Sequence, residues 1–310
     1  MIAFIVKRLI WLVLTLLVVF TVSFFLMRSV PGGPLTRDRQ MEPEVRKNIE
    51  RRYNLDLPLH EQYLWELGRT VRGDLGPSFR LGDFTVNQVI AQGFPISASL
   101  GILALTFALT LGLTAGVVSA VWRGSPFDFS LMSVATVGIA VPNFVLAGLS
   151  IMLFVFVIPI FPAAGWGTLG QLVLPSICLG APYAAEIARL TRTGMLDVMG
   201  QDYIRTAYAK GLSPQRVILV HGLRGALLPV VSFLGPAVAG ILTGSLVIEQ
   251  IFAIPGLGMH FIQAATQRDY TLAMGLVLLY TLLLYSMNFL VDLSYTYLDP
   301  RVELNPARQG

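Results

Sequence analysis

Residues 225–248 read GALLPVVSFLGPAVAGILTGSLVI, and no side chain in this stretch carries a charge. A helix needs about 20 apolar residues to cross the hydrocarbon core of a bilayer, so this run is long enough for one span. Other runs without Asp, Glu, Lys or Arg lie at 9–27, 84–122, 129–185 and 270–291. The sequence therefore predicts a membrane protein with several helical spans.

The composition excludes an ordinary soluble domain. Hydrophobic residues make up 55% of the chain and charged residues 13%, whereas soluble domains have about 45–50% and about 25%. Pro159, Pro162 and a glycine-rich stretch interrupt the run 129–185, so it supplies two spans. We predict an all-α polytopic protein with six transmembrane helices, at about 9–28, 97–121, 129–158, 171–190, 225–249 and 271–294.

Basic residues predict the orientation of these spans, because cytoplasmic loops carry an excess of Lys and Arg. Lys7 and Arg8 precede the first span, and Arg123 lies between the second and third. The loop between the fourth and fifth spans is also rich in basic residues: Arg189, Arg192, Arg205, Lys210, Arg216 and Arg224. Both termini and this loop are therefore predicted to be cytoplasmic.

This topology divides the chain into segments. We expect an N-terminal transmembrane helix at 1–29, an extracytoplasmic insert at 30–95, a five-helix core at 96–298 with a cytoplasmic loop at 191–224, and a cytoplasmic tail at 299–310. In the insert, Pro43 and Pro58 each open a predicted helix. The expected apolar stripes are Val45, Ile49 and Tyr53 on the first, and Leu59, Tyr63 or Leu64, Leu67 and Val71 on the second.

The sequence contains no motif for an enzyme or a metal site. No glycine-rich loop ends in Gly-Lys-Ser or Gly-Lys-Thr, so a nucleotide site of the P-loop type is absent. The histidines His60, His221 and His260 lack metal-ligand spacing. No nucleic-acid recognition motif accompanies the basic residues. We predict no catalytic residue, no metal site and no cofactor in this chain, and no nucleic-acid partner.

An ion-coupled carrier is the less favoured alternative. Such a carrier would use an ionisable side chain near the middle of a span, but Glu186, Glu249 and Asp292 all fall near the predicted helix ends. If the chain takes part in transport, its energy is therefore expected to come from another subunit.

A short polar segment interrupts the apolar sequence on the cytoplasmic side. Asp202 suits an N-cap and Gly211 suits the position after a helix, which predicts a helix over 203–210. Small residues at Ala207, Ala209 and Gly211 would let the surface of another protein approach its backbone. The alternative is a helix that lies on the bilayer surface, which its basic character also permits.

This segment resembles the signature loop of the membrane subunits of peptide-importing ABC transporters, which has Glu-Ala-Ala, three residues, Gly, nine residues and Ile-x-Leu-Pro. Arg205-Thr206-Ala207 stands at the Glu-Ala-Ala position, and Gly211 is the matching glycine. His221 and Arg224 replace the Ile and the Pro, so the sequence departs from the pattern at these two positions, and Arg224 leaves the bend after the helix open.

Other motifs extend the resemblance over nearly the whole chain, to the B-type permease of oligopeptide importers. They are Pro31-Gly32-Gly33-Pro34, Gly73-Asp74-Leu75-Gly76-Pro77-Ser78-Phe79, Pro255-Gly256-Leu257-Gly258, Arg268-Asp269-Tyr270 and Asp299-Pro300-Arg301. The resemblance implies the fold of a type I ABC importer permease in the bacterial cytoplasmic (inner) membrane. It also implies a non-catalytic subunit that forms half of a pathway for peptides.

The resemblance further implies partners and sites. The partners are a homologous C-type permease, two ABC ATPase subunits that bind ATP and Mg, an extracytoplasmic peptide-binding protein and membrane lipid. The ATPase-coupling helix would comprise Asp202, Tyr203, Ile204, Arg205, Thr206, Ala207, Tyr208, Lys210 and Gly211. The same architecture could also carry dipeptides, nickel chelates or peptide-like antibiotics.

A glycine-rich turn follows the fifth span on the predicted outer side. Pro255, Gly256, Leu257 and Gly258 form it, and Glu249 precedes it. Pro-Gly followed by a second Gly favours a tight turn. These residues are a candidate outer gate, and an ordinary turn is the alternative.

Overall fold

A computed structural model describes residues 2–30 and 43–298. Within these ranges the regular structure is helical, and one isolated β-bridge pairs Pro77 with Thr85. The predicted all-α class is confirmed. The predicted tail 299–310 and the motifs at 31–34 and 299–301 lie outside the described residues.

The chain folds into two compact units, and each unit combines separate parts of the sequence. Unit 1 comprises residues up to 96 and residues 255–283, and unit 2 comprises residues 97–254 and those from 284 onward. The elements are α1 (Ile2–Ser29), α2 (Pro43–Arg52), α3 (Leu59–Val71), α4 (Val86–Val121), α5 (Pro126–Ala140), α6 (Asn143–Ile151), the π-helix η1 (Met152–Val157), α7 (Leu169–Met199), α8 (Asp202–Ala209), α9 (Pro214–Arg216), the π-helix η2 (Val217–Gly222), α10 (Leu223–Ile251), α11 (Leu257–Gln267) and α12 (Tyr270–Leu298).

In unit 1, aromatic side chains fasten the insert to the first helix. Phe20 and Phe24 of α1 are buried, and Tyr63 of α3 meets both rings edge-on, with centroids 5.6 and 5.3 Å away. A second cluster joins the start of α4 to α11 and α12 through Val86, Leu257 and Leu276. The insert therefore packs on membrane helices of its own chain.

The predicted helices of the insert are present, but the apolar stripe on the second one is partly wrong. Leu59, Leu64 and Val71 are exposed, at 52, 64 and 78%. Polar Gln62 and Glu66 are buried instead, because the Arg28 guanidinium at the end of α1 donates a hydrogen bond to each. Polar partners on α1 thus decide which face of α3 turns inward.

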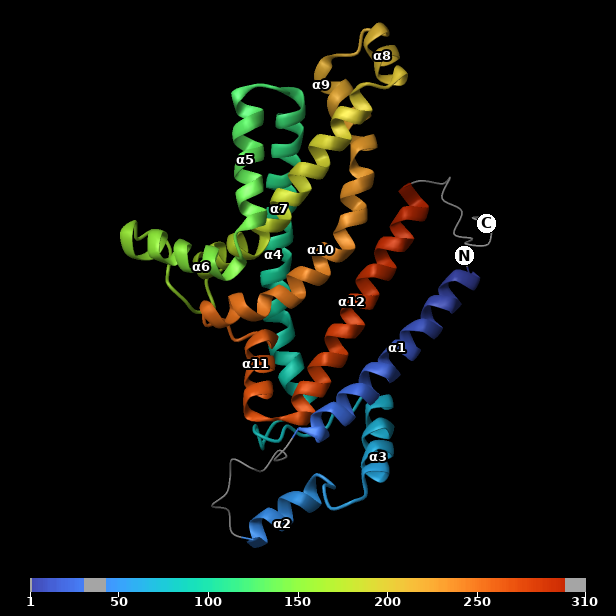
Figure 1. Ribbon diagram of the computed structural model, residues 1–310, viewed down its shortest axis with the longest axis vertical. Coiled ribbons are helices and arrows are strands. Elements are labelled where there is room, and N and C mark those ends of the chain that lie inside the picture. The colour runs from blue at the N-terminus through green and yellow to red at the C-terminus, as the bar shows by residue number, and fades with distance from the viewer. Residues whose placement is uncertain (1, 31–42, 299–310) are drawn as a thin grey trace. The chain divides into compact units, whose positions relative to one another are not determined.

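In unit 2, α7 runs between the α4–α5 hairpin and α10 (Figure 1). Small residues let these helices approach closely, as is common between membrane helices. A Cβ atom at Gly180 would lie 2.5 Å from the carbonyl oxygen of Ala104 in α4, and one at Gly194 would lie 2.9 Å from that of Ala226 in α10. Neither site has room for a larger side chain.

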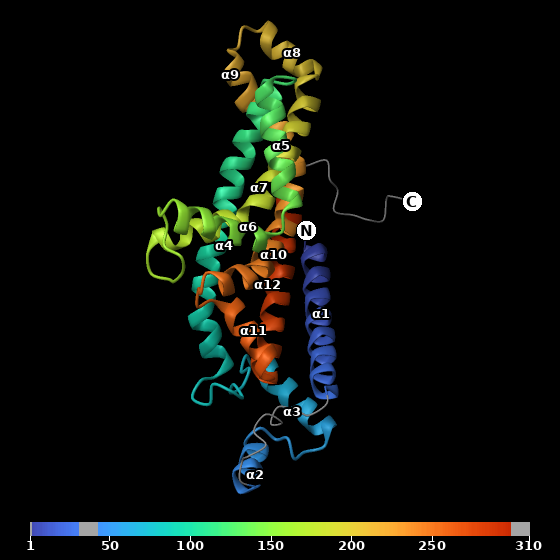
Figure 2. The same ribbon diagram turned by 60° about the vertical axis from the view of Figure 1, so that its left-hand side comes forward.

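The third predicted span, 129–158, is not one straight helix. Val141 is extended, as is favoured before a proline, and Pro142 precedes α6. The chain bends by 107° between α5 and the α6–η1 segment, and α6 crosses the direction of α5 in both views (Figures 1 and 2). The described residues contain five helices long and apolar enough to span a membrane, or six if this bent pair is one span.

Candidate functional site

The predicted cytoplasmic helix is α8, which lies between α7 and α9 at one end of unit 2 (Figure 1). Its start differs by one residue from the expected one. Gln201 is the N-cap, and its carbonyl oxygen accepts from the amides of Ile204 and Arg205. Asp202 is therefore the first helical residue, where its negative charge favours the positive end of the helix dipole.

The helix ends at Ala209, one residue before the predicted end, and Gly211 follows the C-cap residue Lys210, as expected. Gly211 has a φ of +78°, in the left-handed region. The amide of Gly211 donates to the carbonyl oxygen of Tyr208 at 2.9 Å, and that of Leu212 donates to Ala207 at 3.4 Å. This pair of bonds is a Schellman motif, which satisfies carbonyl groups at the end of the helix. The chain can then turn back toward the membrane.

One face of α8 packs on its own chain. Ile204 and Ala207 form a buried cluster with Val217 of η2, and Val198, Met199 and Leu212 pack around it. The expectation that Ala207 faces outward, toward another protein, is therefore wrong. Ile204 and Ala207 lie on the same side of the helix, and Val217 supplies the apolar surface that covers both.

The rest of the α8 surface is exposed and carries aromatic and basic side chains. Tyr203 and Tyr208 flank the buried pair, since each lies four residues from one of its members. Tyr203 is 49% exposed and Tyr208 is 41% exposed, and Arg205, Thr206 and Lys210 are exposed as well. We call Tyr203, Arg205, Thr206, Tyr208 and Lys210 the outer face of α8. Tyr and Arg are the residue types most often found at the centres of protein interfaces.

Sequence reasoning missed a charged cluster near this helix. The Asp128 carboxylate at the start of α5 accepts from Arg192 of α7 at 2.7 and 2.8 Å. It also accepts from the hydroxyl of Ser119 in α4. The positions of Asp128 and Ser119 at the edges of charge-free runs gave no sign that they would meet Arg192.

The predicted outer turn starts a helix. Gly256 is the N-cap of α11, and Leu257 and Gly258 are buried while Pro255 is exposed. Leu257 lies so close to α4 that a Cβ atom at Gly93 would be 2.9 Å from its side chain. Glu249, near the end of α10, is fully buried. The gate remains a prediction.

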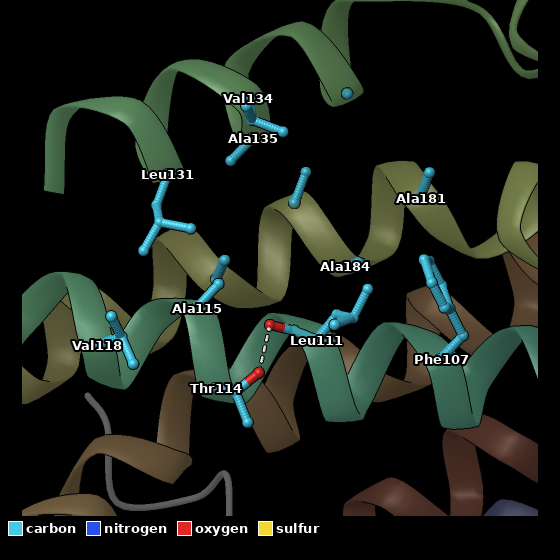
Figure 3. A pocket seen from close by; sticks show the side chains of 13 residues that line it. Phe107, Leu111, Thr114, Ala115, Val118, Leu131, Val134, Ala135, Ala181 and Ala184 are labelled. Atoms are coloured by element: carbon cyan, nitrogen blue, oxygen red, sulfur yellow. Dashed lines mark hydrogen bonds between the residues drawn. The ribbon is translucent and has the colours of Figure 1, made fainter. Parts of the chain in front are cut away.

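An apolar groove of about 440 Å³ lies between α4, α5 and α7 in unit 2 (Figure 3). Its walls include Phe107, Leu111, Leu131 and Val134, and the small residues Ala181 and Ala184 (Figure 3). The one hydroxyl among its lining residues, that of Thr114, donates to backbone carbonyls of its own helix. Apart from this hydroxyl, the side chains that line the groove are apolar.

Among the residues that the structure describes, no three His, Cys, Asp or Glu side chains are grouped so as to hold a metal ion. The single cysteine, Cys178, is buried in α7.

Known families match almost all of the chain. The profile described as binding-protein-dependent transport system inner membrane component matches residues 109–304. The profile of the N-terminal part of such membrane components matches residues 1–101.

Two relatives cover nearly the full length of the chain. The oligopeptide transport system permease protein OppB of Haemophilus influenzae is 45% identical over 304 residues, which are 97% of this chain and 99% of that protein. The dipeptide transport system permease protein DppB of Bacillus subtilis is 46% identical over 302 residues, which are 97% of this chain and 98% of that protein.

Solved structures share the fold. A chain of the methionine ABC transporter MetNI, solved in inward-facing conformations, has a TM-score of 0.55 and 20% identity, covering 68% of this chain and 97% of that one. A chain of an amino acid ABC transporter solved with histidines has a TM-score of 0.52 and 17% identity. The match covers 68% of this chain and 94% of that one. Both comparisons support the predicted type I importer fold.

Proposed function

Because the chain belongs to the family of binding-protein-dependent transport system inner membrane components, we propose that it imports peptides with energy from ATP. It is a multi-pass inner membrane protein and a permease subunit. The proposal concerns its cargo, its partners and the residues that couple it to them.

The geometry of α8 is the observation that carries the proposal. Its buried face fixes the helix to Val217 of η2, and its outer face stays exposed at the end of unit 2. A short helix held in this way can enter a groove of a soluble protein without first becoming ordered, so little conformational entropy is lost on binding. We assign this docking role to the outer face of α8, with a cytoplasmic ATPase as the partner.

Force on α8 would reach the membrane spans through covalent connections at both of its ends. Two residues separate Met199, the last residue of α7, from the start of α8, and α10 follows η2 directly. Movement of the ATPase subunits would thus shift the cytoplasmic ends of α7 and α10 and change access to the pathway. ATP and Mg would be bound by two ATPase subunits, since this sequence has no P-loop.

The remaining partners follow from the type of transporter. A homologous C-type permease would form the other half of the pathway, and an extracytoplasmic binding protein would deliver the cargo. The relatives are named for oligopeptide and dipeptide transport, which favours peptides over the nickel chelates and antibiotics that the sequence left open. Glu249 and the turn at 255–258 keep their proposed role as an outer gate.

Reconstituted uptake tests the function. The chain would be placed in vesicles with its C-type permease, ATPases and peptide-loaded binding protein, and uptake of a labelled peptide would be measured. We expect uptake with ATP inside and none with an imposed ion gradient alone. Gradient-driven uptake by this chain without ATPases would contradict the proposal and favour a secondary carrier.

A further inference from the structure

One carboxylate joins three helices of unit 2. Asp128 of α5 is 5% exposed, and its two oxygens accept from Nε and Nη2 of Arg192 in α7, at 2.7 and 2.8 Å. The hydroxyl of Ser119 in α4 also donates to it, and so does the amide of Gly124 in the α4–α5 turn, at 2.9 Å. We call Ser119, Asp128 and Arg192 the three-helix clamp.

The clamp fixes geometry more than it adds stability. A buried ion pair is often no more stabilising than a well-packed apolar pair of the same volume. A two-pronged contact between guanidinium and carboxylate, however, sets both the separation and the orientation of the groups that carry it. Here those groups belong to α5 and α7, and Ser119 adds α4.

The clamp also lies on the route between α8 and the spans. Arg192 precedes the end of α7 at Met199 by about two helical turns, and Asp202 then begins α8. The α4–α5 turn and α8 lie at the same end of unit 2 (Figure 1). A displacement of α8 would therefore pass through the last two turns of α7 and reach Arg192 before the preceding part of that helix.

We propose that Asp128 and Arg192 are positioning residues that make α4, α5 and α7 move as one body when α8 is displaced. This inference rests on the proposed function, in which an ATPase moves α8. Without the clamp, α7 would tilt and leave the α4–α5 hairpin behind. ATP would then be hydrolysed with less opening and closing of the pathway.

A second ion pair on α7 provides a matched control. Nη2 of Arg189 lies 2.5 Å from Oε1 of Glu186 at the i,i+3 spacing, so both partners of this pair belong to α7. Its arginine side chain is 63% exposed. Removal of Arg189 therefore changes the charge of α7 by the same amount without releasing another helix.

The test compares the number of peptides imported per ATP hydrolysed by the reconstituted transporter. The key variant is the double change Asp128→Leu with Arg192→Met, which leaves no buried charge unpaired. We expect normal membrane levels, normal ATPase retention and continued hydrolysis. Import per ATP should fall, because ATP would be hydrolysed without the matching movement of the α4–α5 hairpin. Arg189→Met should keep the wild-type ratio.

A variant that preserves the charge guards against failure to fold. Arg192→Lys keeps the ion pair but lacks the planar fork, so its ratio should lie between those of the wild type and the double variant. A wild-type ratio in either clamp variant would overturn the proposal. Failure of the wild-type chain to retain an ATPase or to import with ATP would overturn the proposed function itself, and the clamp proposal with it.

Discussion

The backbone amide of Gly211 donates a hydrogen bond to the carbonyl oxygen of Tyr208 at 2.9 Å, with Gly211 at a φ of +78°. A side chain at that φ is strained, and a β-branched one costs about 1 kcal/mol or more. We predict that Gly211→Val distorts the end of α8, so that ATPase retention and uptake fall together.

The matched control for Gly211 is Gly211→Asn, since Asn tolerates the left-handed region better than other residues. Both variants would be compared by retention of the ATPase on an affinity column, at equal membrane levels. Normal retention and uptake in Gly211→Val would show that the end of α8 does not affect coupling.

The two faces of α8 predict different defects. Ala207→Glu would place a charge in the cluster with Ile204 and Val217, where an unpaired buried charge costs about 3–5 kcal/mol. The segment 201–213 should then be cut readily by protease. Tyr208→Ala, on the outer face, should stay resistant to protease and still lose ATPase retention.

Ala209→Glu controls for the added charge, because Ala209 is exposed on the same helix. Its segment should resist protease like that of the wild type. Equal protease resistance in Ala207→Glu would mean that this face of α8 is not packed on η2.

The features of α8 that depend on neighbouring residues could be predicted from the sequence, and those that depend on distant residues could not. The limits of α8 follow from residues within or next to it, and Gly211 ended the helix as expected. The direction of Ala207 depends on Val217, which belongs to a separate helix. A helix this short offers no long apolar stripe to show which side faces inward.

The bend at Pro142 was likewise not predictable from the sequence. Pro95, Pro175 and Pro182 all lie inside continuous helices, since neighbouring helices can compensate for the hydrogen bond that a proline removes. A proline alone therefore does not predict a break. The Asp128–Arg192 contact joins residues 64 positions apart, and no local pattern reports such a pair.

Sidedness can be tested with single cysteines. Asn48 of the insert and Ser213 after α8 are both exposed, and the native Cys178 is buried, so its background reaction should be small. Asn48→Cys should react with an impermeant maleimide added outside intact cells, and Ser213→Cys should react only after the cells are opened. Labelling of both positions from the same side would contradict the topology.

The contact between α1 and the insert predicts that loss of Arg28 makes the insert easier to cleave from outside. Nη2 of Arg28 lies 2.7 Å from Oε1 of Glu66, with each side chain 11% exposed. Burial raises the pKa of the Glu66 carboxyl, while the Arg28 charge opposes that rise. Arg28→Met would leave Glu66 without this partner and should loosen α3, with faster cleavage of the insert by protease added outside.

Arg72→Met is the control for Arg28→Met, because Arg72 is exposed at the end of α3. Its insert should be cleaved at the wild-type rate. If Arg28→Met were cleaved no faster than Arg72→Met, the contact between Arg28 and Glu66 would not hold the insert on α1.

Photo-crosslinking from the outer face of α8 tests the central claim most directly. A benzophenone amino acid would replace Tyr208, with a second variant carrying it at Leu169, an exposed residue at the opposite end of α7. We predict an adduct between this chain and the ATPase from position 208 and none from position 169. Adducts from position 208 with lipid alone, in a transporter that still imports peptide, would contradict the assignment of α8 as the ATPase-docking helix.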